Sequence, residues 1–221
     1  MAEPFRIDRK EALRYLGLRG QEPDAGTAAL LERAAGMLLE TARPRTVWKT
    51  FELRETEEGL LLPTAGLLLT GKAIRRHLCG CTRCILMAAT LGLETDRLVL
   101  RTQLGSMALA AVLDACASAA VEDVCNQLCA GIARQLERTL TFRFSPGYGD
   151  LPLALQQDFI RSLDTPRKIG LTLTESCMLA PQKSVTAVLG IRPPGEAMPR
   201  ETDSCAGCNL RGRCSFSRDE G

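Results

Sequence analysis

The sequence SMALAAVLDACASAAVEDVCNQLCAGIARQLER, residues 106–138, decides how this chain folds. Its apolar residues follow helical spacing almost without interruption, and small residues on one side allow a neighbouring element to approach closely. The run from Gln103 to Val121 is apolar enough to raise the question of a membrane span. It contains Asp114 and is dominated by small residues that insert poorly into a bilayer. We therefore predict one long, tightly packed helix of a soluble protein, with no membrane partner.

Shorter helices and strands are predicted on both sides of this helix. Capping residues followed by helically spaced apolar residues predict helices that start near Asp8, Asp24, Thr70 and Asp96, and one more over residues 153–163. Runs rich in β-formers predict strands over residues 45–55, 141–144, 168–173 and 184–191, with two short apolar runs after Gly59 and Gly66. Because helices and strands occur in blocks and not in strict alternation, the predicted fold class is α+β.

Composition and charge narrow the class of protein. The 221 residues are 45% hydrophobic and 24% charged, which is typical of a globular protein with one domain and at most a small appendage. The net charge is only +2 and the basic residues are scattered, so we expect no nucleic-acid partner. Residues 1–13 are charged throughout and lack the apolar core of a secretory signal, which predicts a cytoplasmic protein.

The ten cysteines are expected to be reduced in that compartment, as core thiols, metal ligands or redox groups. We divide the chain into a domain over residues 1–191 and a C-terminal tail over residues 192–221, which has few apolar residues. In the tail, Cys205 and Cys208 have the spacing of two ligands of one tetrahedral ion, with Cys214 as a third. Zinc and an iron–sulfur cluster both suit such thiolates, and free thiols are the alternative. A fourth ligand could be Cys81, Cys84 or a residue of a partner.

A second stretch, TFRFSPGYGDLP at residues 141–152, combines an arginine with a glycine-rich turn. Arg143 can offer two parallel N–H groups to a carboxylate, and Gly147 lets the backbone approach a ligand. Tyr148 adds a flat apolar face with a polar tip. The stretch could therefore hold a small anion-bearing ligand, and an ordinary turn between a strand and a helix is the alternative.

Three short motifs together resemble the S-adenosylmethionine-binding activation domain of cobalamin-dependent methionine synthase, in its free-standing form. They are DACASAAVE at residues 114–122, R-x-x-x-G-Y at residues 143–148, and LTES at residues 173–176 followed by Met178 and Ser184-Val185. Their order and spacing agree with the family, and the resemblance covers about residues 1–191. It implies a twisted, mostly antiparallel sheet flanked by helices. One departure is that Gly149-Asp150-Leu151-Pro152 replaces the Pro-Ala-Cys-Pro of the full-length enzyme.

The resemblance also implies roles for single residues. Arg143 would grip the carboxylate of S-adenosylmethionine, Ser145 and Gly147 would offer backbone contacts, and Tyr148 would line the site. Glu122 would accept hydrogen bonds from an ammonium group or from ribose hydroxyls.

The function implied is rescue of a cobalamin enzyme whose cobalt has been oxidised to an inert state. An electron donor such as a flavodoxin or ferredoxin supplies one electron, and S-adenosylmethionine supplies the methyl group. This sequence lacks the D-x-H-x-x-G pattern that supplies cobalamin's lower ligand, so cobalamin would arrive on a partner, methionine synthase or another corrinoid protein. Its single histidine, His77, is predicted to be a polar surface residue at a helix end. Two alternatives stay open: a metal-carrying adaptor, and an activator of a different corrinoid methyltransferase. Whether the chain is itself an enzyme is also open.

Overall fold

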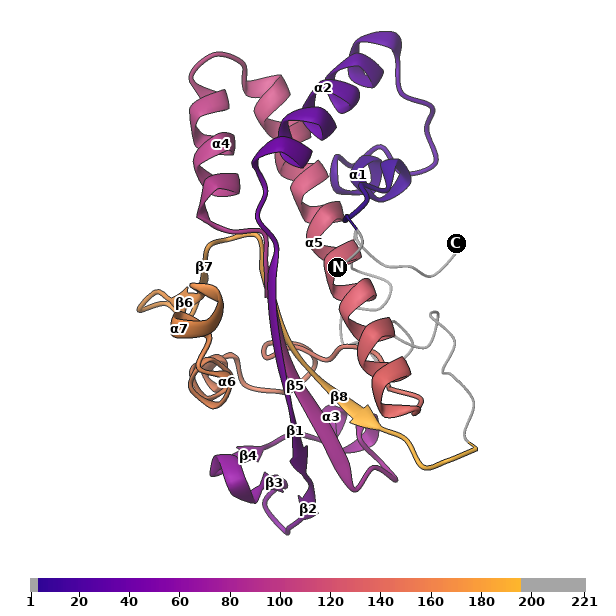
Figure 1. Ribbon diagram of the computed structural model, residues 1–221, viewed down its shortest axis with the longest axis vertical. Helices are drawn as coiled ribbons and strands as arrows, with labels where there is room; N and C mark the ends of the chain where they lie inside the picture. Colours follow the sequence, from indigo (N-terminus) through magenta and orange to yellow (C-terminus); the bar gives the residue numbers. More distant parts are fainter. Residues whose placement is uncertain (1–3, 196–221) are drawn as a thin grey trace.

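A three-stranded antiparallel sheet runs along the length of the molecule and carries helices on both faces (Figure 1). This is a computed structural model, and it describes residues 4–195. The strands are β1 (Arg45–Glu52), β5 (Arg83–Thr90) and β8 (Ser184–Ile191), in the order β1-β5-β8. Strands β1 and β5 pair over their whole length, beginning with Arg45 opposite Thr90. Strands β5 and β8 also pair over their whole length, beginning with Arg83 opposite Ile191. The predicted α+β class with an antiparallel sheet is confirmed.

The sequence analysis assigned no element to the residues of the central strand β5. All of its residues except Arg83 are buried, because helices cover both faces of the sheet at this point. A strand buried on both faces reads as a continuous apolar run without alternation, which periodicity cannot distinguish from a buried helix.

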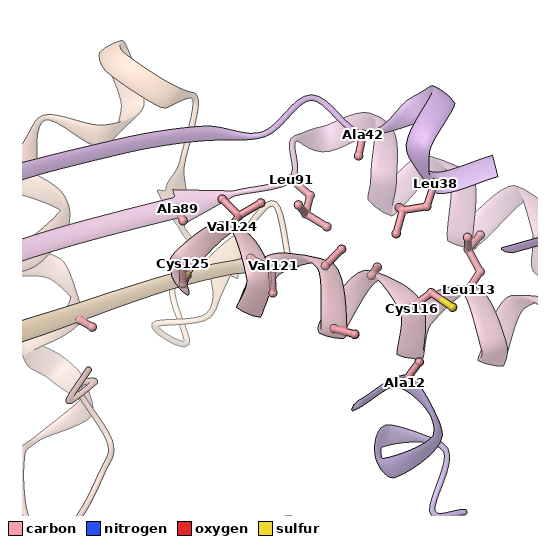
Figure 2. Close-up of a cluster of buried hydrophobic side chains, with 14 of the residues drawn as sticks. Ala12, Leu38, Ala42, Ala89, Leu91, Leu113, Cys116, Val121, Val124 and Cys125 are labelled. Carbon is pink, nitrogen blue, oxygen red and sulfur yellow. The ribbon is translucent and has the colours of Figure 1, made fainter. Parts of the chain in front are cut away.

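Helix α5 (Met107–Leu136) lies along one face of the sheet and is the predicted long helix. The side chain of Ser106 caps its first turn, and its axis is flanked by α1 (Arg9–Tyr15), α2 (Ala25–Thr41) and α4 (Leu93–Gln103). Figure 2 shows Ala12 of α1, Leu38 of α2 and Ala89 of β5 converging on Leu113, Cys116, Val121, Val124 and Cys125 of α5. Alanine and cysteine at these contacts let the backbones approach closely, as predicted.

The opposite face of the sheet carries a second buried cluster around Phe159, whose side chain is completely buried. It is formed by β1, β5, β8 and a set of short elements, of which β2 alone contributes no residue to the cluster. These are β2 (Arg54–Glu55), β3 (Leu60–Leu62), η1 (Pro63–Ala65), β4 (Leu67–Leu69), α3 (Lys72–His77), η2 (Leu153–Leu155), α6 (Gln156–Leu163), α7 (Thr165–Ile169), β6 (Thr172–Leu173) and β7 (Leu179–Ala180). Strands β2, β3 and β4 form one small antiparallel sheet, and β6 and β7 form another.

Several predicted element boundaries are confirmed and others are wrong. The strand predicted over residues 141–144 is an extended segment with isolated bridges only, and the strand predicted over residues 45–55 is divided into β1 and β2, which belong to different sheets. Asp8 and Asp24 cap α1 and α2 as predicted, through bonds to the N–H groups of Lys10 and Thr27 among others. Thr70 does not cap α3, which begins after Gly71. The helix assigned to Asp96 begins earlier, at Leu93.

The strand predicted over residues 168–173 is also wrong. Helix α7 occupies residues up to Ile169, because Pro166 in the first turn of a helix has a φ angle that suits the helix and no N–H to lose. Only Thr172 and Leu173 are in a strand. Within residues 4–195, no helix combines the length and apolar character that crossing a bilayer requires.

Candidate functional site

The site begins at a partly buried ion pair between the extended segment at residues 140–144 and helix α5. Arg143 Nη2 donates to Glu122 Oε2 at 2.5 Å, and its Nη1 donates to Asn126 Oδ1 at 2.8 Å and to Cys129 Sγ at 3.9 Å. The three acceptors are spaced four and three residues apart, so they lie on one face of the helix. The 140–144 segment is held beside β8 by isolated bridges from Leu140 to Ile191 and from Phe144 to Val188.

The charge of Arg143 is strongly favoured in this setting. Burial opposes the charged guanidinium, but the Glu122 carboxylate outweighs it and holds the pKa of Arg143 above its ordinary value. The side chains of Arg143 and Glu122 remain 18% and 26% exposed, so solvent or a ligand can reach them. Three of the five guanidinium N–H groups point to the acceptors on α5. The other two have no acceptor among residues 4–195 and are available to a carboxylate.

A second ion pair lies two helical turns earlier on α5. Lys183 Nζ contacts Asp114 Oδ1 at 2.8 Å and donates to Ser118 Oγ at 3.0 Å. Lys183 directly precedes Ser184 and Val185, so this contact fixes the start of β8 beside α5. The 114–122 motif therefore has an ion pair at each end. Asp114 pairs with Lys183, next to Ser184-Val185 of the third motif, and Glu122 pairs with Arg143 of the second motif.

The turn after Phe144 is closed by its own backbone. Tyr148 N–H donates to Ser145 O at 3.0 Å, and Gly147 N–H donates to Leu151 O at 2.9 Å. Gly147 has φ of +91°, in the left-handed region that glycine adopts without strain. Because its N–H is used inside the turn, Gly147 has only its carbonyl to offer a ligand. Tyr148 is 59% exposed at the tip of the turn.

Arg143 and Tyr148 lie on opposite sides of the 140–144 segment. Arg143 faces α5, whereas Phe144 packs into the cluster around Phe159, and the Tyr148 ring meets the Phe144 ring edge-on at 6.1 Å. Successive side chains of an extended segment point to opposite faces, which explains the separation. A ligand that contacts both residues must therefore cross the edge of the sheet.

Beyond Phe144, no described strand continues along that edge. Val188 and Phe144 exchange both backbone hydrogen bonds, and the chain then turns away from β8. Since alternate residues of a strand direct their backbone groups to the same side, the N–H and C=O of Thr186 also face this edge. Among the described residues, no strand pairs with Ser184–Ala187 on this side. The Thr186 hydroxyl points to the other face and donates to Gln156 Oε1 at 2.9 Å.

His77 is the last residue of α3, so the predicted helix end is confirmed, but the prediction of a surface residue is wrong. Its ring is partly buried and lies against Phe142 and Phe144, with centroids 5.5 and 5.0 Å apart. Its Nε2 and Thr141 Oγ1 are 2.9 Å apart. Burial lowers the pKa of His77 to about 4, and the charge of Arg192 acts in the same direction.

The LTES motif forms the turn between β6 and β7. Thr174 N–H donates to Met178 O at 2.9 Å, and the hydroxyls of Thr174 and Ser176 are 3.0 Å apart. Among residues 4–195, no hydrogen bond or ion pair joins Thr174, Glu175 or Ser176 to Arg143. The contact between this region and α5 is made further along the chain, where Lys183 at the start of β8 binds Asp114 and Ser118.

The sequence analysis missed Asn126, Cys129 and Lys183. Asn126 and Cys129 could have been found by following the face of the predicted helix from Glu122 in steps of four and three residues. Lys183 carried no such signal, because its partner Asp114 lies 69 residues away in the sequence.

The predicted metal ligands Cys205, Cys208 and Cys214 lie outside the described residues, and that prediction stays a prediction. Of the suggested fourth ligands, Cys84 is completely buried, and burial raises the pKa of its thiol far above the ordinary value. A thiol in that state is a poor metal ligand, because the thiolate is the binding form. Within residues 4–195, no cluster of histidine, cysteine and acidic residues could hold a metal ion.

Comparisons with known proteins agree with this architecture. No protein-family model matches the sequence, and a search of curated proteins gives no match. Among solved structures, the chain is similar to a crystal structure of the MetH reactivation domain bound to AdoHcy. The TM-score is 0.62 at 19% sequence identity, over 90% of this chain and 79% of that chain. The predicted reactivation-domain fold is therefore confirmed.

Proposed function

We propose that this protein binds S-adenosylmethionine and presents it to a corrinoid-carrying partner for reductive reactivation. The observation that carries the proposal is the partly exposed Arg143–Glu122 pair beside β8, in a fold shared with a reactivation domain that was solved with AdoHcy bound. AdoHcy and S-adenosylmethionine share the amino acid, ribose and adenine groups, so one site can hold both.

The residues present fit the ligand chemically. The two remaining N–H groups of Arg143 suit the ligand carboxylate, and Glu122 has lone pairs left for an ammonium or ribose hydroxyl. Tyr148 and the Gly147 carbonyl would contact the end of the ligand that reaches past Phe144.

S-Adenosylmethionine would supply the methyl group, and the role of this chain is to bind and orient it. The guanidinium fixes one end of the ligand by charge, and Tyr148 is exposed at the other end of the site. An exposed site suits a domain that offers its ligand to a partner, because the receiving group must approach from outside. We propose methionine synthase as that partner and a flavodoxin or ferredoxin as the electron donor.

The proposal is tested first by titrating the full chain with S-adenosylhomocysteine in a calorimeter. The Arg143→Ala variant should bind at least about tenfold more weakly, because a charge-assisted hydrogen bond contributes about 1.5–3 kcal/mol. Arg161→Ala is the matched control, since Arg161 forms an exposed pair with Asp158 on α6. Absence of binding to the unmodified chain would overturn the proposal.

The partner is tested in a second experiment. Cob(II)alamin-loaded methionine synthase, a reductant and S-adenosylmethionine are combined with and without this chain, and methylcobalamin is followed by its absorbance. Formation that depends on the chain and on Arg143 supports the proposed partner. Ligand binding without such formation would reject methionine synthase as the partner while leaving the ligand assignment intact, and another corrinoid methyltransferase would be tested next.

A further inference from the structure

We propose that α3 is a splint for the ligand motif, and that Asp150 and His77 are its positioning residues. The two ends of this short helix hold the two ends of the 141–150 stretch, so the helix sets the distance and direction between Arg143 and Tyr148. The inference deepens the proposed function and rests on it for the ligand, but the splint itself is a property of the protein alone.

At its N-terminal end, α3 is capped from a distance by Asp150. The N–H of Lys72 donates to Asp150 Oδ2 at 2.6 Å, and the N–H of Ala73 donates to Asp150 Oδ1 at 2.9 Å. The residues are 78 and 77 positions apart, so this cap joins two distant segments. Hydrogen bonds from Ala73 and Lys72 hold the pKa of Asp150 below its ordinary value, so the carboxylate stays charged.

Two glycines allow the contact to be this close. Gly71 has φ of +124°, and a Cβ at that position would lie 2.5 Å from Asp150 Oδ1. A Cβ at Gly149 would lie 2.8 Å from the Cβ of Ala73. Asp150 and Gly149 immediately follow Tyr148, so the docking of this dipeptide fixes the tip of the turn.

At its C-terminal end, α3 is joined to the start of the motif by His77. The imidazole pairs with the Thr141 hydroxyl and lies against Phe142 and Phe144, the two residues on either side of Arg143. The Thr141 hydroxyl also accepts from the N–H of Gly190 at 2.8 Å, which ties the same point to β8.

The six residues of α3 span about 9 Å. Held at both ends, the helix makes the spacing from Thr141 to Asp150 independent of the turn's own flexibility.

The test uses the two tyrosines of the chain, Tyr15 and Tyr148, labelled with 3-fluorotyrosine and observed by fluorine NMR without ligand. The Asp150→Ala variant should shift or broaden the Tyr148 resonance and leave that of Tyr15 unchanged. Asp24→Ala is the matched control, because Asp24 caps α2 in the same way through the N–H of Thr27 but lies far from the turn in the sequence. Asp150→Asn, which keeps one acceptor oxygen, should restore most of the native Tyr148 signal.

Affinity for S-adenosylhomocysteine is measured on the same variants. Asp150→Ala should weaken binding about tenfold, Asp150→Asn should weaken it less than about threefold, and Asp24→Ala should leave it unchanged. An unchanged Tyr148 resonance in both Asp150→Ala and His77→Gln would overturn the splint. If the resonance moves as expected but the unmodified chain binds no ligand, the splint stands and the proposed function fails.

Discussion

Arg143 Nη2 donates to Glu122 Oε2 at 2.5 Å, although the two residues are 21 positions apart in the sequence. Glu122 lies on α5, and Arg143 lies on the 140–144 segment beside β8. Both side chains are partly buried, so each charge has lost part of its hydration and is compensated by the other. Because the pair forms without a ligand, substitutions at either position should change the stability of the protein as well as ligand binding.

The first prediction concerns this effect on stability. Arg143→Ala should lower the free energy of unfolding by about 2 kcal/mol, because Glu122 is left partly buried without its partner. The double variant Arg143→Ala/Glu122→Gln should recover part of the loss, since the unpaired charge is then also gone. Urea unfolding measures both, with Arg161→Ala expected to change stability by less than about 0.5 kcal/mol as an exposed pair. Equal losses in the single and double variants would show that the charges do not interact.

The second prediction concerns pH and His77. The pKa of His77 in the folded protein is about 4, below the ordinary value of 6.5, so the unfolded chain binds more protons between these pH values. Stability is therefore complete above pH 6.5 and falls as the pH is lowered toward 4, by on the order of 3 kcal/mol in total. His77 is the single histidine of the chain, and Arg192 is the charged residue that adds to its shift. Urea unfolding at pH 7 and pH 5 should show a smaller pH effect in His77→Gln than in the unmodified chain, and identical pH effects would contradict this account.

The third prediction compares two glycine-to-alanine changes. A Cβ at Gly190 would lie 2.6 Å from Cys81 Sγ and 3.0 Å from Leu78 Cδ2, so Gly190→Ala should destabilise the protein by about 1–3 kcal/mol through overpacking of β8. Gly131 lies inside α5 and has no neighbour within 4 Å of such a Cβ. Gly131→Ala should therefore stabilise the protein by about 0.5–1 kcal/mol, as alanine is the better helix former. Thermal unfolding of both variants gives the two signs, and a stabilising Gly190→Ala would show that β8 moves easily.

The fourth prediction orders the thiols by reactivity. Burial raises the pKa of Cys116 to about 11 and that of Cys125 to about 12, while Cys79 is exposed. Only the thiolate reacts, so iodoacetamide at pH 8 should modify Cys79 well before Cys116 and Cys125, which should stay unmodified in the folded protein. Peptide mass spectrometry assigns each site, and labelling in urea shows that every thiol is reactive once unfolded. Rapid labelling of Cys125 in the folded chain would mean that α5 opens readily.

The sequence predicted the parts of the fold whose signals are local. The long helix at residues 106–138 and the caps at Asp8 and Asp24 depend on neighbouring residues, and the structure has them where predicted. Strand β5 was missed because covering both faces removes the alternation that marks a strand. The cap of α3 was assigned to Thr70, while the true acceptor, Asp150, is brought there by tertiary structure alone.

The candidate site was predicted in the same uneven way. The resemblance selected Glu122 and Arg143 as ligand contacts, and the structure places them together. The resemblance gave no sign that the two side chains bind each other when no ligand is present. The roles of Ser145, Gly147 and Tyr148 remain predictions. Arg143 and Tyr148 lie on opposite sides because successive side chains of the extended 140–144 segment alternate between its two faces. The motif alone does not show that this segment is extended.

The position of β5 between β1 and β8 also has a consequence for how the protein is made. Ser184 bonds Thr90 across 94 residues, so the sheet cannot be completed until nearly the whole domain has left the ribosome. Until then β5 offers its apolar residues and one unsatisfied backbone edge to any other nascent chain. Slow folding is the expected result, because the central strand β5 pairs with β8, the last strand of the domain to be synthesised.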